Sequence, residues 1–271
     1  MINLRLGFTE TTLLFYFYLD TIVNDDSIKL LYNGSQNGLI NWLYSTSGFY
    51  DKTIIGDYFN FDGIKCTESV CYNNYMNKLL NIIKKTTIVR LCFHGINQNL
   101  IKYKEQFIEY LGIDGSIITG GCRKEDLYNL IENKKVLIIN PLSPLIKEQY
   151  DNNNVKYVDS KFPNVENIIS YENPYTFFNS GPDDNSFETV YKICNDIKNL
   201  DFNVAVISSG AISSLLAEYI NTELGKDVLV YGGMLSIYFG IDKNNNNIGW
   251  ISVPDKYKPL NYQKIENGRY W

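Results

Sequence analysis

The chain has 271 residues, of which 45% are hydrophobic and 20% are charged, and this composition argues against a largely disordered protein. Its 25 Lys and Arg residues against 30 Asp and Glu residues give a net charge of -5 at pH 7. No cationic field is therefore expected to hold nucleic acid, so nucleic acid is excluded as a partner.

The first apolar run covers residues 13–19 (LLFYFYL). It is far shorter than the ~20 residues that a membrane-spanning helix needs, and no basic segment precedes it. The five cysteines are scattered, with no CxxC spacing, which favours a reducing compartment over a zinc site or a disulfide framework. We expect a cytoplasmic protein without a transmembrane segment, whose oligomeric state the sequence leaves open.

Short β-branched runs predict buried strands at residues 87–93, 135–139, 204–208 and 228–231. Apolar residues recur at helical spacing over residues 99–111, 124–132, 144–150, 187–198 and 213–224. This alternation predicts an α/β fold, with a Rossmann-like, mostly parallel sheet covered by helices on both faces. Such a sheet binds its ligand at the carboxyl ends of the strands.

The pattern is strongest in residues 86–271, which we interpret as the Rossmann-like region. Residues 1–85 are less regular and are a candidate for a sub-lobe of the same α/β unit. No internal repeat and no long linker divides the chain, so we expect one unit over residues 1–271.

Two glycine-containing turns follow predicted strands. Ser209, Gly210 and Ala211 form the first turn, before a helix whose amino end would attract phosphate. Gly232 and Gly233 form the second and allow backbone to lie against a ligand. Both turns are candidate parts of a diphosphate site; the alternative is that each glycine only makes a tight turn, since neither a GxGxxG nor a P-loop pattern is present.

His94, the only histidine, follows the strand predicted at 87–93 and is a candidate general base for an acceptor hydroxyl. A structural role for His94 is the alternative. Arg90, in the same strand, is expected to pair with a buried carboxylate or to anchor phosphate.

Four segments occur in the order found in a known family. They are KKVLIINPLSPLIKEQY (134–150), DFNVAVISSGA (201–211), GAISSLLAEYINTELGKDVLVYGGMLSIYFGID (210–242) and ENGRYW (266–271). With them, the chain resembles a bacterial polysaccharide-biosynthesis family related to glycosyltransferases of the GT-D fold. The resemblance covers residues 85–271, and extends weakly to residues 33–44 and 47–50.

The resemblance implies a nucleoside diphosphate sugar as donor and a glycan hydroxyl as acceptor. In related GT-D enzymes a segment R-x-G-D-x-E supplies acidic residues to the diphosphate and to a divalent metal, Mn²⁺ or Mg²⁺. Residues 32–37 align with this segment, so that Gly34 is kept while Ser35 and Asn37 stand at the acidic positions. Because hard cations prefer carboxylate oxygen, either transfer proceeds without metal, or other acids substitute, or activity is lost.

Lys243 and Arg269 are the cations that the resemblance brings nearest to a leaving diphosphate. Positive charge there would stabilise the diphosphate as the glycosidic bond breaks. Two alternatives remain: a sugar-nucleotide or glycan-binding protein without turnover, and another Rossmann enzyme such as an S-adenosylmethionine-dependent methyltransferase.

Overall fold

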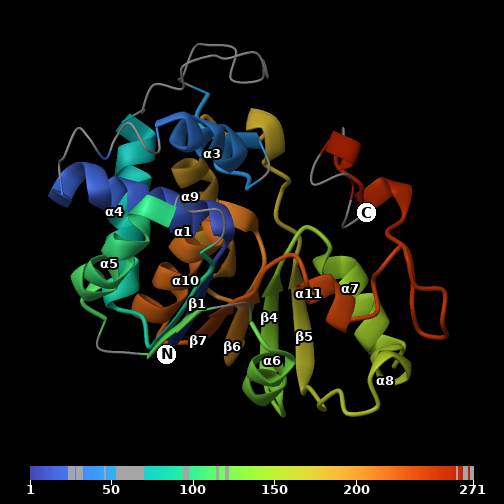
Figure 1. The fold of residues 1–271 in the computed structure, drawn as a ribbon. Coiled ribbons are helices and arrows are strands. Elements are labelled where there is room, and N and C mark those ends of the chain that lie inside the picture. Colours follow the sequence, from blue (N-terminus) through green and yellow to red (C-terminus); the bar gives the residue numbers. More distant parts are fainter. Residues whose placement is uncertain are drawn as a thin grey trace.

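A computed structural model describes residues 1–23, 28, 33–45, 47–52, 70–93, 98–113, 116–119, 122–260, 262–264 and 268. These residues form a seven-stranded sheet in the order β3-β2-β1-β7-β6-β4-β5, in which every neighbouring pair is parallel (Figure 1). The α/β fold predicted from the sequence is confirmed. Its parallel sheet brings the carboxyl ends of all strands to one edge.

The strands are short. Their bounds are β1 Ile2–Leu6, β2 Ile88–Leu91, β3 Ser116–Thr119, β4 Lys135–Ile139, β5 Asn167–Tyr171, β6 Val204–Ile207 and β7 Asp227–Val230. The four strands predicted from the sequence are β2, β4, β6 and β7. The strands β1, β3 and β5 are not among those predicted, because none of the three is a continuous apolar run.

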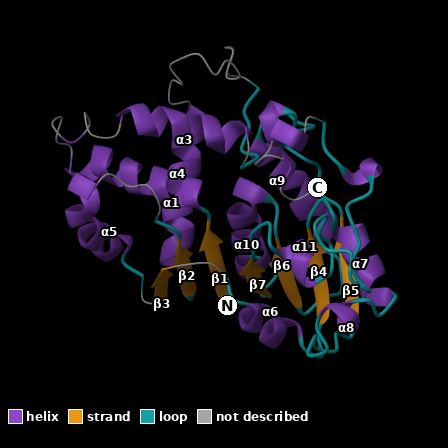
Figure 2. Cartoon of the chain, turned by 45° about the vertical axis from the view of Figure 1, so that its right-hand side comes forward, coloured by secondary structure: helices purple, strands orange, loops and turns teal. Residues whose placement is uncertain are grey.

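Helices cover both faces of the sheet (Figure 2). One face carries α1 Phe8–Tyr18, α3 Asn33–Ser45, α4 Val70–Lys84, α5 Lys104–Leu111, α9 Ser186–Ile197 and α10 Ser213–Thr222. The other carries α6 Lys124–Ile131, α7 Ser143–Asp151, α8 Val155–Val158 and α11 Leu235–Tyr238. The predicted helices agree with α6, α7, α9 and α10, and with α5 together with a preceding 3-10 turn, Gln98–Tyr103.

Alternation along the central strands explains the two faces. In β4, Leu137 and Ile139 belong to the core beneath α1 and α10, whereas Val136 and Ile138 belong to the core beneath α6 and α7. A strand with apolar side chains on both sides is buried only when helices pack on both sides.

The first part of the chain belongs to the same sheet. β1 lies between β2 and β7, so residues 1–85, the candidate sub-lobe, supply a strand to its middle. The apolar run at residues 13–19 lies mostly in α1 and packs into the core. No helix within the described residues combines the length and the hydropathy that crossing a lipid bilayer requires.

Residues 47–52, the loop after α3, are fastened to the region between β5 and α9. The Thr176 hydroxyl donates to the Gly48 carbonyl (2.6 Å), and the Tyr50 N–H donates to the Ser186 hydroxyl (2.8 Å). The Asp51 N–H donates to the Asn179 side chain (3.1 Å). These bonds join parts of the chain more than 120 positions apart, beside the carboxyl edge of the sheet.

A buried polar cluster completes this attachment. The Tyr50 hydroxyl is hydrogen-bonded to Thr189, and Thr189 donates to a carboxylate oxygen of Asp183 (2.5 Å). Lys192 also donates to Asp183, and these two bonds hold the pKa of the Asp183 carboxyl below its ordinary value. The cluster therefore requires an ionised Asp183.

We expect Asp183→Asn to lower the free energy of unfolding at pH 7 by about 1–2 kcal/mol, because hydrogen bonds to a charged group are lost. Since the folded pKa of Asp183 lies below its unfolded value of about 3.9, the contribution is complete above about pH 4 and disappears as the pH falls through the folded pKa. Urea denaturation at several pH values tests this, with the exposed Asp255→Asn as control. A difference from wild type that stays constant down to pH 2 would contradict it.

Candidate functional site

A cavity of about 710 Å³ lies at the carboxyl edge of the sheet. Its walls come from the segments that follow β1, β4, β5, β6 and β7, together with α3 and the 47–52 loop. The lining includes residues 5–10, 42, 47–48, 140–142, 173–177, 208–211, 213–214, 230–233 and 236. This is the edge at which the parallel sheet was expected to bind its ligand.

The turn after β6 approaches another part of the protein closely. Gly210 has a φ of +60°, and a Cβ there would overlap the carbonyl oxygen of Ser47. The Ala211 N–H donates to that same oxygen (2.7 Å). Gly210 is therefore required for contact with the 47–52 loop, and the Ala211 N–H is already engaged.

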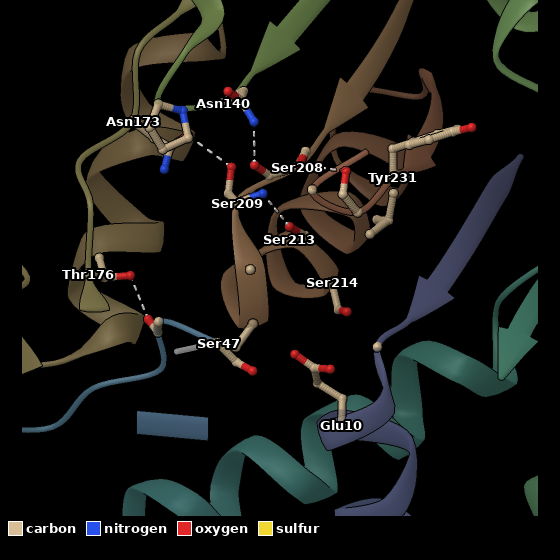
Figure 3. A pocket seen from close by; sticks show the side chains of 18 of the residues that line it. Glu10, Ser47, Asn140, Asn173, Thr176, Ser208, Ser209, Ser213, Ser214 and Tyr231 are labelled. Carbon is tan, nitrogen blue, oxygen red and sulfur yellow. Dashed lines mark hydrogen bonds between the residues drawn. The ribbon is translucent and has the colours of Figure 1, made fainter. Parts of the chain in front are cut away.

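Several polar side chains of the cavity hold its loops together (Figure 3). The Ser209 hydroxyl is bonded to the Asn173 side chain (2.9 Å), and the Ser209 N–H donates to Ser213 (2.9 Å). The Asn140 amide donates to the Ser208 carbonyl (2.8 Å). These hydrogen bonds hold the loops around the cavity, and the groups that form them are not available to a ligand.

The turn after β7 packs against the guanidinium of Arg5. A Cβ on Gly232 would overlap the guanidinium of Arg5, so the absence of a side chain at Gly232 makes room for this cation. The N–H groups of Gly210, Gly232 and Gly233 donate no hydrogen bond to the residues that the structure describes. The cavity thus combines a guanidinium with unpaired backbone donors, which is a typical anion-binding arrangement.

No carboxylate within the described part of the chain pairs with Arg5. Its neighbour in register on β2 is Arg90, which is 2% exposed and bonded to Asp126 (2.6 Å). This is the carboxylate pairing expected for Arg90. Asp126 also binds the side chain of Arg123 (3.2 Å), so one carboxylate serves two arginines other than Arg5.

Cys122 and Tyr231, two further titratable groups of this region, do not balance the charge of Arg5 either. Burial raises the pKa of the Cys122 thiol to about 12, against the opposing influence of Arg5 and Arg90. Burial likewise raises the pKa of the Tyr231 hydroxyl. Both groups are neutral at pH 7, so neither supplies a negative charge to the half-buried guanidinium.

Glu10 is the one carboxylate among the described lining residues. It lies in the first turn of α1, is 9% exposed and rests against Gly7, where a Cβ would lie 2.5 Å from its Oε2 atom. The positive amino end of α1 favours the ionised carboxylate. Figure 3 shows Glu10 pointing into the cavity toward Ser47 and Ser214.

Several residues expected from the sequence are not described at side-chain level. His94 and Arg269 lie outside the described residues. Gly34, Ser35 and Asn37 belong to α3, but their side chains are likewise outside the description. Their proposed roles stay predictions.

Lys243 is described, and it donates to the backbone carbonyl of Gly268 instead of lining the cavity. Arg5 and Glu10, by contrast, are not among the residues expected from the sequence. Their spacing was a usable signal: Arg5, Gly7 and Glu10 match three of the four fixed positions of R-x-G-D-x-E, with Phe8 at the position of the aspartate.

Comparison of the chain with models of known protein families, with curated proteins and with solved structures finds no match.

Gly210→Ala should destabilise the protein more than Gly225→Ala. Both glycines have a left-handed φ, +60° and +65°, but a Cβ at Gly225 meets no atom within 4 Å. We expect a loss of about 1 kcal/mol for Gly225→Ala from backbone strain alone, and about 2–4 kcal/mol for Gly210→Ala, which must also displace Ser47. Denaturant titration of both variants measures the difference; equal losses would show that the Ser47 contact contributes nothing.

Proposed function

We propose that the chain is a glycosyltransferase that moves a sugar from a nucleoside diphosphate sugar to a hydroxyl group of a glycan acceptor, in glycan or polysaccharide biosynthesis. The observation that carries this proposal is Arg5, a cation with no carboxylate partner among the described residues, beside unpaired backbone N–H groups in a cavity at the carboxyl edge of a parallel sheet. Such a site calls for an anionic ligand, and a diphosphate supplies the charge.

Residues of the cavity add a further match to the motif of GT-D enzymes. On the basis of their position, we prefer to match R-x-G-D-x-E with residues 5–10 rather than with residues 32–37. Arg5, Gly7 and Glu10 are then retained, and Phe8 is the single departure. This match spans the end of β1 and the first turn of α1, next to the turn that contains Gly232 and Gly233.

In this proposal the diphosphate of the donor lies between Arg5 and the glycine turns. The guanidinium can form two parallel hydrogen bonds to phosphate oxygens, and the N–H groups of Gly232 and Gly233 add two more donors. Charge builds up on the diphosphate as it leaves, so these donors bind it more strongly in the transition state than in the ground state.

Glu10 is the proposed general base. It accepts the proton of the acceptor hydroxyl as the acceptor oxygen forms its bond to C1 of the sugar. The bond between C1 and the diphosphate oxygen breaks, and its electron pair leaves with the nucleoside diphosphate. Because Glu10 is nearly buried, a bound acceptor would meet it without much competing water.

The cavity does not suit a metal held by carboxylates. Mn²⁺ and Mg²⁺ prefer several oxygen ligands, whereas Glu10 is a lone carboxylate in the described lining. Among the described residues, no three His, Cys, Asp or Glu side chains lie together so that they could hold a metal ion. We therefore assign stabilisation of the leaving group to Arg5 and the backbone donors.

Two variants should separate binding from transfer. Arg5→Met should weaken binding of nucleoside diphosphates by about 10- to 100-fold, because a charge-assisted hydrogen-bond pair is lost. Glu10→Gln should keep most of the binding but slow transfer by about 10²- to 10⁴-fold. Calorimetry with UDP-, GDP-, CMP- and dTDP-sugars, followed by mass spectrometry of the products, measures both effects.

Lys243→Met is the matched control, because this lysine is engaged outside the cavity. If Lys243→Met weakens binding as much as Arg5→Met, the assignment of Arg5 is wrong. Binding by the wild type without turnover on any acceptor would favour a sugar-nucleotide-binding protein over an enzyme.

Phe8→Asp should introduce metal dependence, because it restores a second carboxylate beside Glu10. We expect Mn²⁺ to raise the affinity of this variant for a nucleoside diphosphate by at least about tenfold, and that of the wild type by less than about twofold. Phe8→Asn is the uncharged control. Strong Mn²⁺ dependence in the wild type would mean that other acids serve the metal.

A further inference from the structure

We propose that Trp42 binds the nucleobase of the donor by stacking, and thereby distinguishes nucleoside diphosphates from other diphosphates. This inference rests on the proposed function and adds the part of the ligand that the Arg5 site does not explain. It concerns the part of the cavity wall, here called the rim, to which Phe8, Trp42, Tyr175 and Phe177 contribute aromatic side chains.

Two large aromatic side chains of the cavity are well exposed. Trp42 on α3 is 44% exposed and Phe8 at the start of α1 is 37% exposed, and both line the cavity. Single exposed apolar side chains are common on protein surfaces, but exposed aromatic rings that line a concave cavity are a typical ligand-binding surface. Trp42 is the more exposed of the two and has the larger ring.

A second aromatic pair continues the rim. Tyr175 and Phe177 also line the cavity, with ring centroids 5.6 Å apart and planes inclined by 30°. The Tyr175 hydroxyl is fixed by a bond to the Tyr257 carbonyl (2.8 Å). The helix α3, which carries Trp42, packs against both α1, which carries Phe8, and the turn Phe177–Asn179, so the elements that carry these aromatic groups adjoin one another.

The polar groups near the rim favour a planar base over a sugar ring. A sugar presents hydroxyls around its edge, and each of them needs a hydrogen-bond partner. The Thr176 hydroxyl donates to the Gly48 carbonyl. The Asn173 side chain accepts a bond from the Ser209 hydroxyl and donates to the Pro174 carbonyl. A base needs few such bonds and gains stacking energy with little dependence on its identity.

The charge distribution orients the ligand. Arg5 and the glycine turns can take the diphosphate, as proposed above, and the rim then takes the group at its other end. A ligand that fills both parts is anionic at one end and flat and aromatic at the other. Nucleoside diphosphates have this shape, whereas inorganic pyrophosphate has only the anionic end.

The test compares inorganic pyrophosphate with UDP, CDP, dTDP, GDP and ADP on the wild type, Trp42→Phe, Trp42→Ala and Trp250→Phe. Affinity is measured by calorimetry, and tryptophan fluorescence is followed in the same titrations. We expect a nucleoside diphosphate to bind the wild type at least about tenfold more tightly than pyrophosphate and to quench its fluorescence. Trp42→Ala should abolish this advantage while leaving the affinity for pyrophosphate unchanged.

Trp42→Phe should keep most of the advantage, because it keeps an aromatic face, and Trp250→Phe should keep the quenching. Binding of pyrophosphate without any gain from a nucleoside would overturn the stacking inference and leave the anion site intact. An advantage that survives Trp42→Ala would overturn it as well. Failure of pyrophosphate and of every nucleotide to bind would instead overturn the proposed function, and this inference with it.

Discussion

The guanidinium of Arg5, half-buried and without a carboxylate partner among the described residues, is the feature on which the site depends. Leaving a cation partly buried and unpaired is costly, and the neighbouring groups do not relieve it. Asp126 is taken by Arg90 and Arg123, and the thiol of Cys122 stays protonated. A bound anion can supply the partner that Arg5 lacks, and the adjoining glycine turns line the same cavity.

The site is built from both ends of the chain. β1 places Arg5 between strands that come from residues some 80 and 220 positions later, and α1, which follows β1, places Glu10 in the same cavity. The 47–52 loop closes one side of the cavity through Gly210 and the cluster around Asp183. In our proposal, the residues that bind the diphosphate, the nucleobase and the acceptor come together only when the whole unit folds.

Much of the fold could be predicted from periodicity, because β4, β6 and β7 are apolar runs followed by amphipathic helices. β1 was not predicted, because it is not a continuous apolar run; its alternation of Ile2, Leu4 and Leu6 with Asn3 and Arg5 is nevertheless the pattern of a strand and was a usable signal. The glycines were located correctly in the cavity wall, but no sequence pattern could reveal that Gly210 faces Ser47 or that Gly232 faces Arg5. Those contacts are set by tertiary packing between segments far apart in the chain.

The most direct measurement is a crystal structure of the chain grown with inorganic pyrophosphate. We expect its oxygens within hydrogen-bond distance of the Arg5 guanidinium and of the Gly232 and Gly233 N–H groups, in the cavity at the carboxyl edge of the sheet. Pyrophosphate bound elsewhere, with Arg5 paired to a carboxylate of the protein itself, would contradict the assignment of this cavity as a diphosphate site.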